Sequence, residues 1–273
     1  KFIWKYPTEH FISTPPTVAD LNRDGMVETL FLTTDGSVHC LDESGQARWS
    51  RSFQSDPGGF KNVVAADVHI SDGLEVLFGF DDGWLRCLSA DGRVLWEFYG
   101  DRFRVGGISV GDADADGAPE IIYGTDNGNL YCLNGYGEVE WRFSELAPFG
   151  RSGTNLADLD NDGVPEVLVT RSNVNNKCCL IAVSGRDGTL LWRTQDVMQG
   201  YVSNAVVDFE RDGKYEVIHA DKGNNLYVEN NDGSRRWHAP LDQARGVFWA
   251  PAVADVDGDG QLEILVGMRQ QAP

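Results

Sequence analysis

The sequence predicts an all-β fold, a six-bladed β-propeller, and two observations predict it. An acidic loop recurs six times at spacings of 45 to 50 residues, beginning at Asp20, Asp67, Asp112, Asp158, Asp208 and Asp255. A tryptophan recurs in step with these loops, at Trp4, Trp49, Trp96, Trp141, Trp192 and Trp237. A period of this length along a whole chain is typical of repeat units that cannot bury a core alone and therefore stack on one another.

Each repeat unit reads as four short strands, and residues 105–143 show the pattern. The apolar run VGGISVG leads into the acidic loop, and PEIIYGT, NLYCLN and EVEWRF follow, separated by turns that contain glycine. Four short strands with such turns predict one antiparallel blade. No segment shows a helical apolar period, so we expect almost no helix. The units begin near residues 13, 60, 105, 151, 201 and 248.

The spacing also predicts how the ring closes in one domain spanning residues 1–273. Trp4 precedes Asp20 by 16 residues, and the other tryptophans precede the next loop by 16 to 18 residues. We therefore expect residues 1–6 to complete the last blade, with Lys1–Lys5 as its fourth strand, and this closure would leave no free sheet edge. The residues after Met268 are too few for the third strand of that blade. The sequence does not explain this missing strand.

Five of the six loops carry oxygen-bearing side chains at positions 1, 3, 5 and 9 and a glycine at position 6. Alternate spacing lets a curled loop point its ligands inward, and the carbonyl at position 7 adds an oxygen, so the pattern favours Ca²⁺ at about five sites. The expected ligands are Asp20, Asn22, Asp24, Met26 and Glu28; Asp112, Asp114, Asp116, Ala118 and Glu120; Asp158, Asp160, Asp162, Val164 and Glu166; Asp208, Glu210, Asp212, Lys214 and Glu216; and Asp255, Asp257, Asp259, Gln261 and Glu263.

The second loop departs from this pattern, and the alternative interpretation applies most strongly to it. Asp67, His69, Ser71 and Glu75 hold positions 1, 3, 5 and 9, but Asp72 stands in the place of the glycine. We expect this site to be weak or empty. The alternative for every loop is a solvated acidic turn, and five copies in register make that alternative less favourable than it would be for one copy.

Charge and hydropathy exclude two classes of partner. The formal net charge is −19, which argues against nucleic acid as the main partner. The chain contains no run of 18 apolar residues, so we expect no membrane insertion.

The repeated DxDxDGxxE loops resemble the FG-GAP/VCBS repeats of integrin α-subunit propellers. Only fragments of the Phe-Gly and Gly-Ala-Pro signatures are present, at Phe78-Gly79 and Gly117-Ala118-Pro119. Blade endings such as ADGRVLW also resemble quinoprotein-type propeller repeats. The resemblance implies calcium-stiffened blades and an adhesive, lectin-like or scaffold role, but fold does not fix a ligand.

A ligand surface is expected at the end of the blades opposite the acidic loops. Lys61, Arg104 and Arg151 hold nearly equivalent positions in three successive units, with Tyr201 and Trp249 in other links between units. Arginine binds carboxylates through two parallel hydrogen bonds. The polar insertion in residues 171–177 would lie at the same end, so we expect an acidic glycan there. The alternative is an ordinary solvated surface.

The sequence therefore favours a non-catalytic, calcium-binding recognition or adhesion module, monomeric and extracellular, on the cell surface or in the periplasm. Its expected partner is a glycan or a protein. The alternatives are a propeller enzyme, either a polysaccharide lyase or a quinoprotein-type dehydrogenase, and a scaffold or sensor domain of a larger protein. No nucleophile motif is present, and the five histidines occupy unrelated positions in the repeat.

Overall fold

The structure is a computed structural model that describes residues 3–53, 55, 62–68, 72–145, 149, 153–174, 177–195, 197–198, 204–221, 223–241, 244–247 and 251–270. Every regular element in these ranges is a β-strand, as the sequence predicts. None of the described residues belongs to a helix that is long and apolar enough to cross a membrane.

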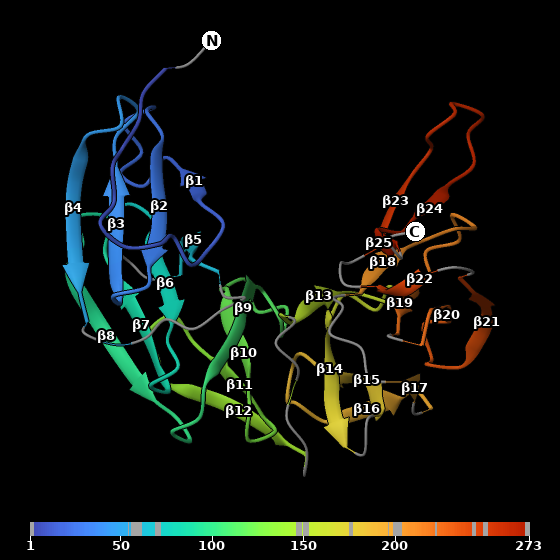
Figure 1. Cartoon of the computed structure of the whole chain (residues 1–273). Helices are drawn as coiled ribbons and strands as arrows, with labels where there is room; N and C mark the ends of the chain where they lie inside the picture. The colour runs from blue at the N-terminus through green and yellow to red at the C-terminus, as the bar shows by residue number, and fades with distance from the viewer. Residues whose placement is uncertain are drawn as a thin grey trace. The chain divides into compact units, whose positions relative to one another are not determined.

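The first three sheets each contain four strands that pair in chain order (Figure 1). The first sheet comprises β1 (Thr17–Ala19), β2 (Glu28–Thr33), β3 (Ser37–Leu41) and β4 (Ala47–Ser52). The second comprises β5 (Val64–Ala66), β6 (Glu75–Gly79), β7 (Trp84–Leu88) and β8 (Val94–Tyr99). The third comprises β9 (Val105–Gly111), β10 (Glu120–Thr125), β11 (Asn129–Leu133) and β12 (Val139–Ser144).

Two further four-stranded paths and two strand pairs follow. The fourth sheet comprises β13 (Asn155–Ala157), β14 (Glu166–Val174), β15 (Lys177–Ser184) and β16 (Leu190–Arg193), and β17 (Val197–Met198) also pairs with β15. The fifth comprises β18 (Ala205–Val207), β19 (Glu216–Ala220), β20 (Asn225–Glu229) and β21 (Arg235–Pro240). Then β23 (Ala252–Ala254) pairs with β24 (Glu263–Leu265), and β22 (Ala244–Val247) pairs with β25 (Met268–Gln270).

The predicted blade of four antiparallel strands is confirmed in five sheets, and the sixth unit contributes its first two strands as β23 and β24. The strand expected at the N-terminus is not observed, since residues 3–6 adopt no regular structure. Closure of a six-bladed ring and the single domain stay predictions. The chain groups into two compact units, residues 1–111 with 117–142, and residues 112–116 with 143–273.

The core of each unit lies between neighbouring sheets. All residues of β10 and β11 are buried, whereas most residues of β12 are exposed. The same gradient from inner to outer strands repeats in the first sheet, where Leu30 and Leu32 of β2 pack in one cluster with Phe78 and Phe80 of the second sheet. Burial on both faces explains why the middle strands read as continuous apolar runs rather than as alternating ones.

Three of the repeat tryptophans join their sheet to a turn of the next one. The Trp49 indole N–H donates to the carbonyl of Ala90 at 2.8 Å, and its ring covers Gly92, where a Cβ would lie 2.7 Å from the ring atom Cδ2. Gly92 also has a φ of 78°, which favours glycine. Trp96 and Trp192 repeat both contacts with the turns of the following sheets.

Candidate metal centre in the acidic loops

The acidic loops are curled around their own aspartates, as the loop beginning at Asp158 shows. Asp158 accepts the N–H of Asp162 at 3.1 Å and the N–H of Gly163 at 2.9 Å, one on each carboxylate oxygen. Asp162 in turn accepts the N–H of Val164 at 2.8 Å. The loops at Asp20 and Asp208 repeat all three bonds, and the loop at Asp255 repeats the bonds at positions 6 and 7. These bonds pull the side chains at positions 1, 3 and 5 to the inside of each turn.

Backbone conformation explains why these residue types recur. Position 4 has a left-handed φ in four of the loops, at Arg23, Ala115, Asn161 and Arg211, and the loop at Asp255 has glycine there, Gly258. Position 6 is left-handed in all five, with φ between 84° and 95°. A side chain costs energy in that region, so the glycine at position 6 is required by the curl itself.

The glutamate at position 9 closes each loop onto its own sheet, a role that the sequence did not predict. Glu166 Oε2 accepts the N–H of Leu159 at 2.7 Å, and Glu28, Glu216 and Glu263 accept the equivalent N–H in their loops. Glu75 of the second loop does the same with Val68, although that loop lacks the glycine. This glutamate is therefore part of the loop architecture whether or not a metal binds, and one of its oxygens is already engaged.

Carboxylates come together in three of the five predicted sites. Ligand atoms of Asp158, Asp160 and Glu166 lie within 4.8 Å of one another, and so do those of Asp255, Asp257 and Asp259. Asp112 and Asp114 gather in the same way in the third loop. Three carboxylate oxygens this close repel one another unless a cation or a proton lies between them. Burial, together with the charges of the neighbouring aspartates, raises the pKa of Glu166 to about 7.

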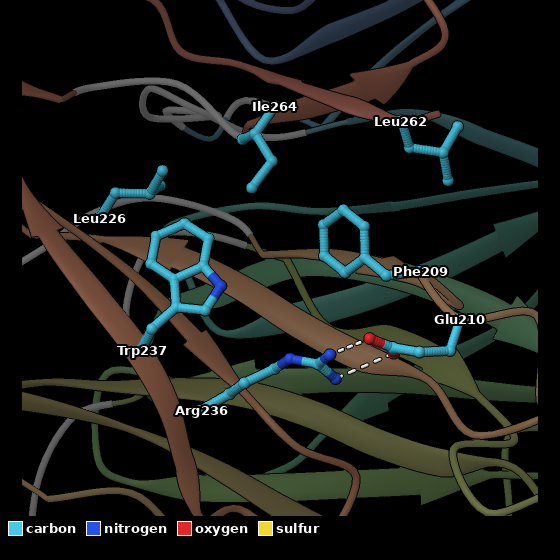
Figure 2. A pocket seen from close by; sticks show the side chains of 7 residues that line it. All are labelled: Phe209, Glu210, Leu226, Arg236, Trp237, Leu262 and Ile264. Carbon is cyan, nitrogen blue, oxygen red and sulfur yellow. Dashed lines mark hydrogen bonds and ion pairs between the residues drawn. The ribbon is translucent and has the colours of Figure 1, made fainter. Parts of the chain in front are cut away.

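Among the described residues, the loops at Asp20 and Asp208 form no such group, and in each of them an arginine bonds to the position-9 glutamate. Arg236 Nη1 donates to Glu216 Oε1 at 2.8 Å. Nη1 also donates to Glu210 Oε2 at 2.9 Å, and Nη2 bonds to Glu210 Oε1, as Figure 2 shows. Arg48 bonds to Glu28 in the first loop and lies 3.9 Å from Asp24. In these two loops the guanidinium supplies the positive charge that the carboxylates need.

The residue at one position of the fourth strand indicates whether an arginine lies in the loop, and the sequence analysis did not consider this position. The arginines directly precede the repeat tryptophans Trp49 and Trp237 on β4 and β21. The same position holds Leu95, Glu140 and Leu191 in the other units, none of which is a cation. The fourth strand thus decides whether the loop between the first two strands contains a built-in charge.

The position-7 residues also make a backbone hydrogen bond inside the loop, and the expected ligand role of their carbonyls stays a prediction. Met26, Val164, Lys214 and Gln261 each donate their backbone N–H to the aspartate at position 5, at 2.8 to 2.9 Å. That bond orients the aspartate side chain. Of the second loop, His69 and Ser71 lie outside the described residues, and the weak or empty site predicted there stays a prediction.

The predicted ligand surface is reduced to one described residue. Arg104 Nε lies 2.9 Å from Asp81 and 3.6 Å from Asp126, so its charge is balanced within the chain. Lys61, Arg151, Tyr201 and Trp249 lie outside the described residues. The insertion at residues 171–177 lengthens the hairpin of β14 and β15, in which Arg171 pairs with Cys179.

A cavity of about 520 Å³ opens beside the arginine-bridged loop (Figure 2). Phe209, Leu226 and Trp237 line it from the fifth sheet and its acidic loop, and Leu262 and Ile264 line it from the strand pair β23–β24. The Arg236–Glu210 ion pair also lies on its wall, as Figure 2 shows. Apolar side chains therefore cover one side of this cavity and an ion pair covers another.

Comparisons with known proteins agree on a propeller. The family model described as outer membrane protein assembly factor BamB matches residues 81–259. The solved structure of BamB from Moraxella catarrhalis is similar with a TM-score of 0.50 and 14% identity, covering 92% of this chain and 82% of that one. No curated protein matches the sequence.

Two other solved structures show the same fold. Quinohemoprotein alcohol dehydrogenase from Comamonas testosteroni matches with a TM-score of 0.61 and 16% identity, covering 94% of this chain and 46% of that one. The V. cholerae biofilm matrix protein Bap1 matches with a TM-score of 0.51 and 12% identity, covering 91% and 73%. Identities this low show the fold alone.

Proposed function

Because this chain belongs to the propeller-repeat family described as outer membrane protein assembly factor BamB, we propose that it is a non-catalytic β-propeller scaffold of the cell envelope, stiffened by calcium. The family match covers residues 81–259 and carries the scaffold part of this proposal. The quinoprotein-like blade endings of the sequence agree with that match. The calcium part rests on the loops, which resemble FG-GAP repeats.

The observation that supports calcium is the contrast between the two kinds of loop. Where an arginine is present, it lies against the position-9 glutamate, as Arg48 and Arg236 do. In the loop at Asp158, the carboxylates of Asp158, Asp160 and Glu166 converge, and no lysine or arginine of the described part of the chain pairs with them. Hard oxygen ligands in a flexible loop suit Ca²⁺ better than Mg²⁺ or a transition metal. We therefore propose calcium where carboxylates converge, in the loops at Asp112, Asp158 and Asp255, and an arginine in its place in the loops at Asp20 and Asp208.

The test measures bound metal and thermal stability together. A ligand that binds only the folded state adds RT ln(1 + [L]/Kd) for each site, about 2.7 kcal/mol at a hundredfold excess over Kd. We expect calcium to raise the melting temperature of chelator-treated protein, and equilibrium dialysis to count about three ions.

A matched pair of variants makes the test specific to the loop. Asp160→Asn removes one carboxylate from the converging group, whereas Asp187→Asn removes an exposed one from the turn between β15 and β16 of the same sheet. Asp160→Asn should lose about one ion, because the ligands of one loop act together. Asp187→Asn should keep the full count. Equal counts in the two variants, or no response of the melting curve to calcium, would refute the calcium proposal.

We also propose an extracytoplasmic location and a protein or glycan partner. The location is supported by the family description, which names an outer membrane assembly factor. An acidic glycan at the end opposite the acidic loops has less support than the sequence alone gave it, since Arg104 is balanced by Asp81 and Asp126. A protein partner is therefore the better-supported class, in keeping with an assembly factor. A pull-down with immobilised protein, compared with a panel of uronic-acid and neutral glycans, separates the two classes.

A further inference from the structure

The tryptophans of the repeat provide an internal standard for what covers an indole ring in this chain. The rings of Trp4, Trp49, Trp96 and Trp192 each lie against a glycine with a left-handed backbone, namely Gly45, Gly92, Gly137 and Gly233. A Cβ on any of these glycines would lie 2.5 to 2.7 Å from the ring. Three of the four tryptophans also donate their indole N–H to a carbonyl of the same turn.

Trp237 holds the same position on β21 and lacks this cover. Its exposed fraction is 38%, against 7% for Trp141 in the third sheet. In the part of the chain that the structure describes, no glycine turn lies against Trp237. Its ring instead faces the cavity of about 520 Å³ shown in Figure 2.

The neighbouring strands show what is absent from this cavity. In the cluster between the first two sheets, Leu88 comes from β7, the third strand of the second sheet. In the cluster between the second and third sheets, Tyr131 and Leu133 come from β11, again a third strand. Of the described residues of the next unit, Val253, Ile264 and Val266 pack against the cluster around Leu226, and these lie in or beside β23 and β24. The cavity is therefore the volume that a third strand fills elsewhere in the chain.

A free sheet edge adjoins the same cavity. β24 pairs with β23, and no other described strand pairs with it. An unpaired edge presents backbone N–H and C=O groups that can add another strand. Residues 1–6, which the sequence assigns to the last blade, would supply a fourth strand but contain no glycine to cover Trp237.

We propose that Trp237, the cavity beside it and the edge of β24 form a docking site for one β-hairpin. Its first strand pairs with β24 and fills the cavity with apolar side chains. Its turn carries a left-handed glycine that lies against the Trp237 ring and a carbonyl that accepts the indole N–H. The partner is thus a polypeptide segment with alternating apolar residues and a turn of the Asp-Gly or Asn-x-x-Gly kind, as in the turns that cover Trp49 and Trp96.

The experiment supplies such a hairpin to the whole chain. Residues 225–240, NLYVENNDGSRRWHAP, contain a suitable turn and no cysteine, and they are fused after residue 273 through a flexible Gly/Ser linker that makes docking intramolecular. The matched control carries valine in place of the fused glycine that corresponds to Gly233, because a side chain there meets the indole ring. Hydrogen exchange of the Glu263–Leu265 amides and the melting temperature are measured in both fusions.

The glycine fusion should slow amide exchange in β24 about tenfold, as expected for new ladder hydrogen bonds, and raise the melting temperature by several degrees relative to the valine fusion. The same two fusions made in a Trp237→Ala chain should have equal amide exchange rates and equal melting temperatures. Both fusions then carry the Trp237→Ala substitution, so its own effect on stability cancels in the comparison. Equal exchange in the two fusions of the parent chain would overturn the proposal. A dimer of the unfused chain that disappears in Trp237→Ala would overturn it too, because a second copy would then be the occupant.

Discussion

Arg236 provides the sharpest test of how the acidic loops are neutralised, through the substitution Arg236→Met. Methionine keeps an unbranched apolar side chain at this position and removes the charge. The side chain of Glu216 is 6% exposed. In the variant, one of its carboxylate oxygens still accepts the Phe209 N–H, and the other loses its ion pair with the guanidinium. The Glu210 side chain, 43% exposed, can turn to solvent.

The expected cost follows from this burial. Removing one partner of a fully buried ion pair costs roughly 3–5 kcal/mol. The Arg236 side chain is 34% exposed, so solvent screens part of the interaction, and we expect a loss of about 2 kcal/mol in the free energy of unfolding in chelator. Urea unfolding of the parent and the variant in excess EDTA measures this difference.

Calcium should then distinguish this variant from an ordinary destabilised one. With the guanidinium gone, the oxygens of Asp208, Glu210 and Glu216 are open to a metal ion, so the number of bound ions should rise by about one and calcium should restore most of the lost stability. The control is Arg93→Met, which removes an arginine whose side chain is 74% exposed and which pairs with Asp91. It should cost less than about 1 kcal/mol and leave the ion count unchanged.

Two results would refute this reasoning at different points. If Arg236→Met is no less stable in EDTA than Arg93→Met, the guanidinium does not neutralise the loop. If Arg236→Met is destabilised but binds no additional calcium, the arginine is structural and does not take the place of a calcium ion in this loop.

Three further outcomes are expected. Burial raises the pKa of Glu166 from 4.5 to about 7, so the folded state keeps a proton that the unfolded chain releases. In EDTA, the free energy of unfolding should therefore fall as the pH rises from 4.5 to about 7. Urea titrations should show a smaller dependence on pH for Glu166→Gln. Gly92→Val should lower the melting temperature sharply, since its Cβ meets Trp49, whereas Gly25→Val, where a Cβ meets nothing within 4 Å, should cost only the left-handed backbone strain. Arg104→Ala should leave binding to a uronic-acid glycan array unchanged, because Asp81 and Asp126 already balance its charge.

Some of these features are local in sequence and could be predicted from it. The turns, the short apolar strands and the curled acidic loops each depend on fewer than about ten neighbouring residues, whose backbone preferences are strong. The four-stranded units and the loop positions were therefore predictable. Gly163 shows this well, since its φ of 91° is what a glycine at position 6 allows. The N-terminal strand was not observed at residues 3–6, because a strand needs a partner edge that its own residues do not provide.

The sequence by itself determined the repeat, the strand order and the curl of the acidic loops, because all three follow from short-range backbone chemistry repeated in register. Only the tertiary structure decided which loops hold an arginine against their position-9 glutamate. Arg48 lies 20 residues from Glu28, and pairing across the sheet brings them together, so no local pattern reveals the contact. It also decided that Arg104 is balanced by Asp81 and Asp126, and that Trp237 faces a cavity rather than a glycine turn, since ion pairing and burial depend on neighbours that the fold supplies.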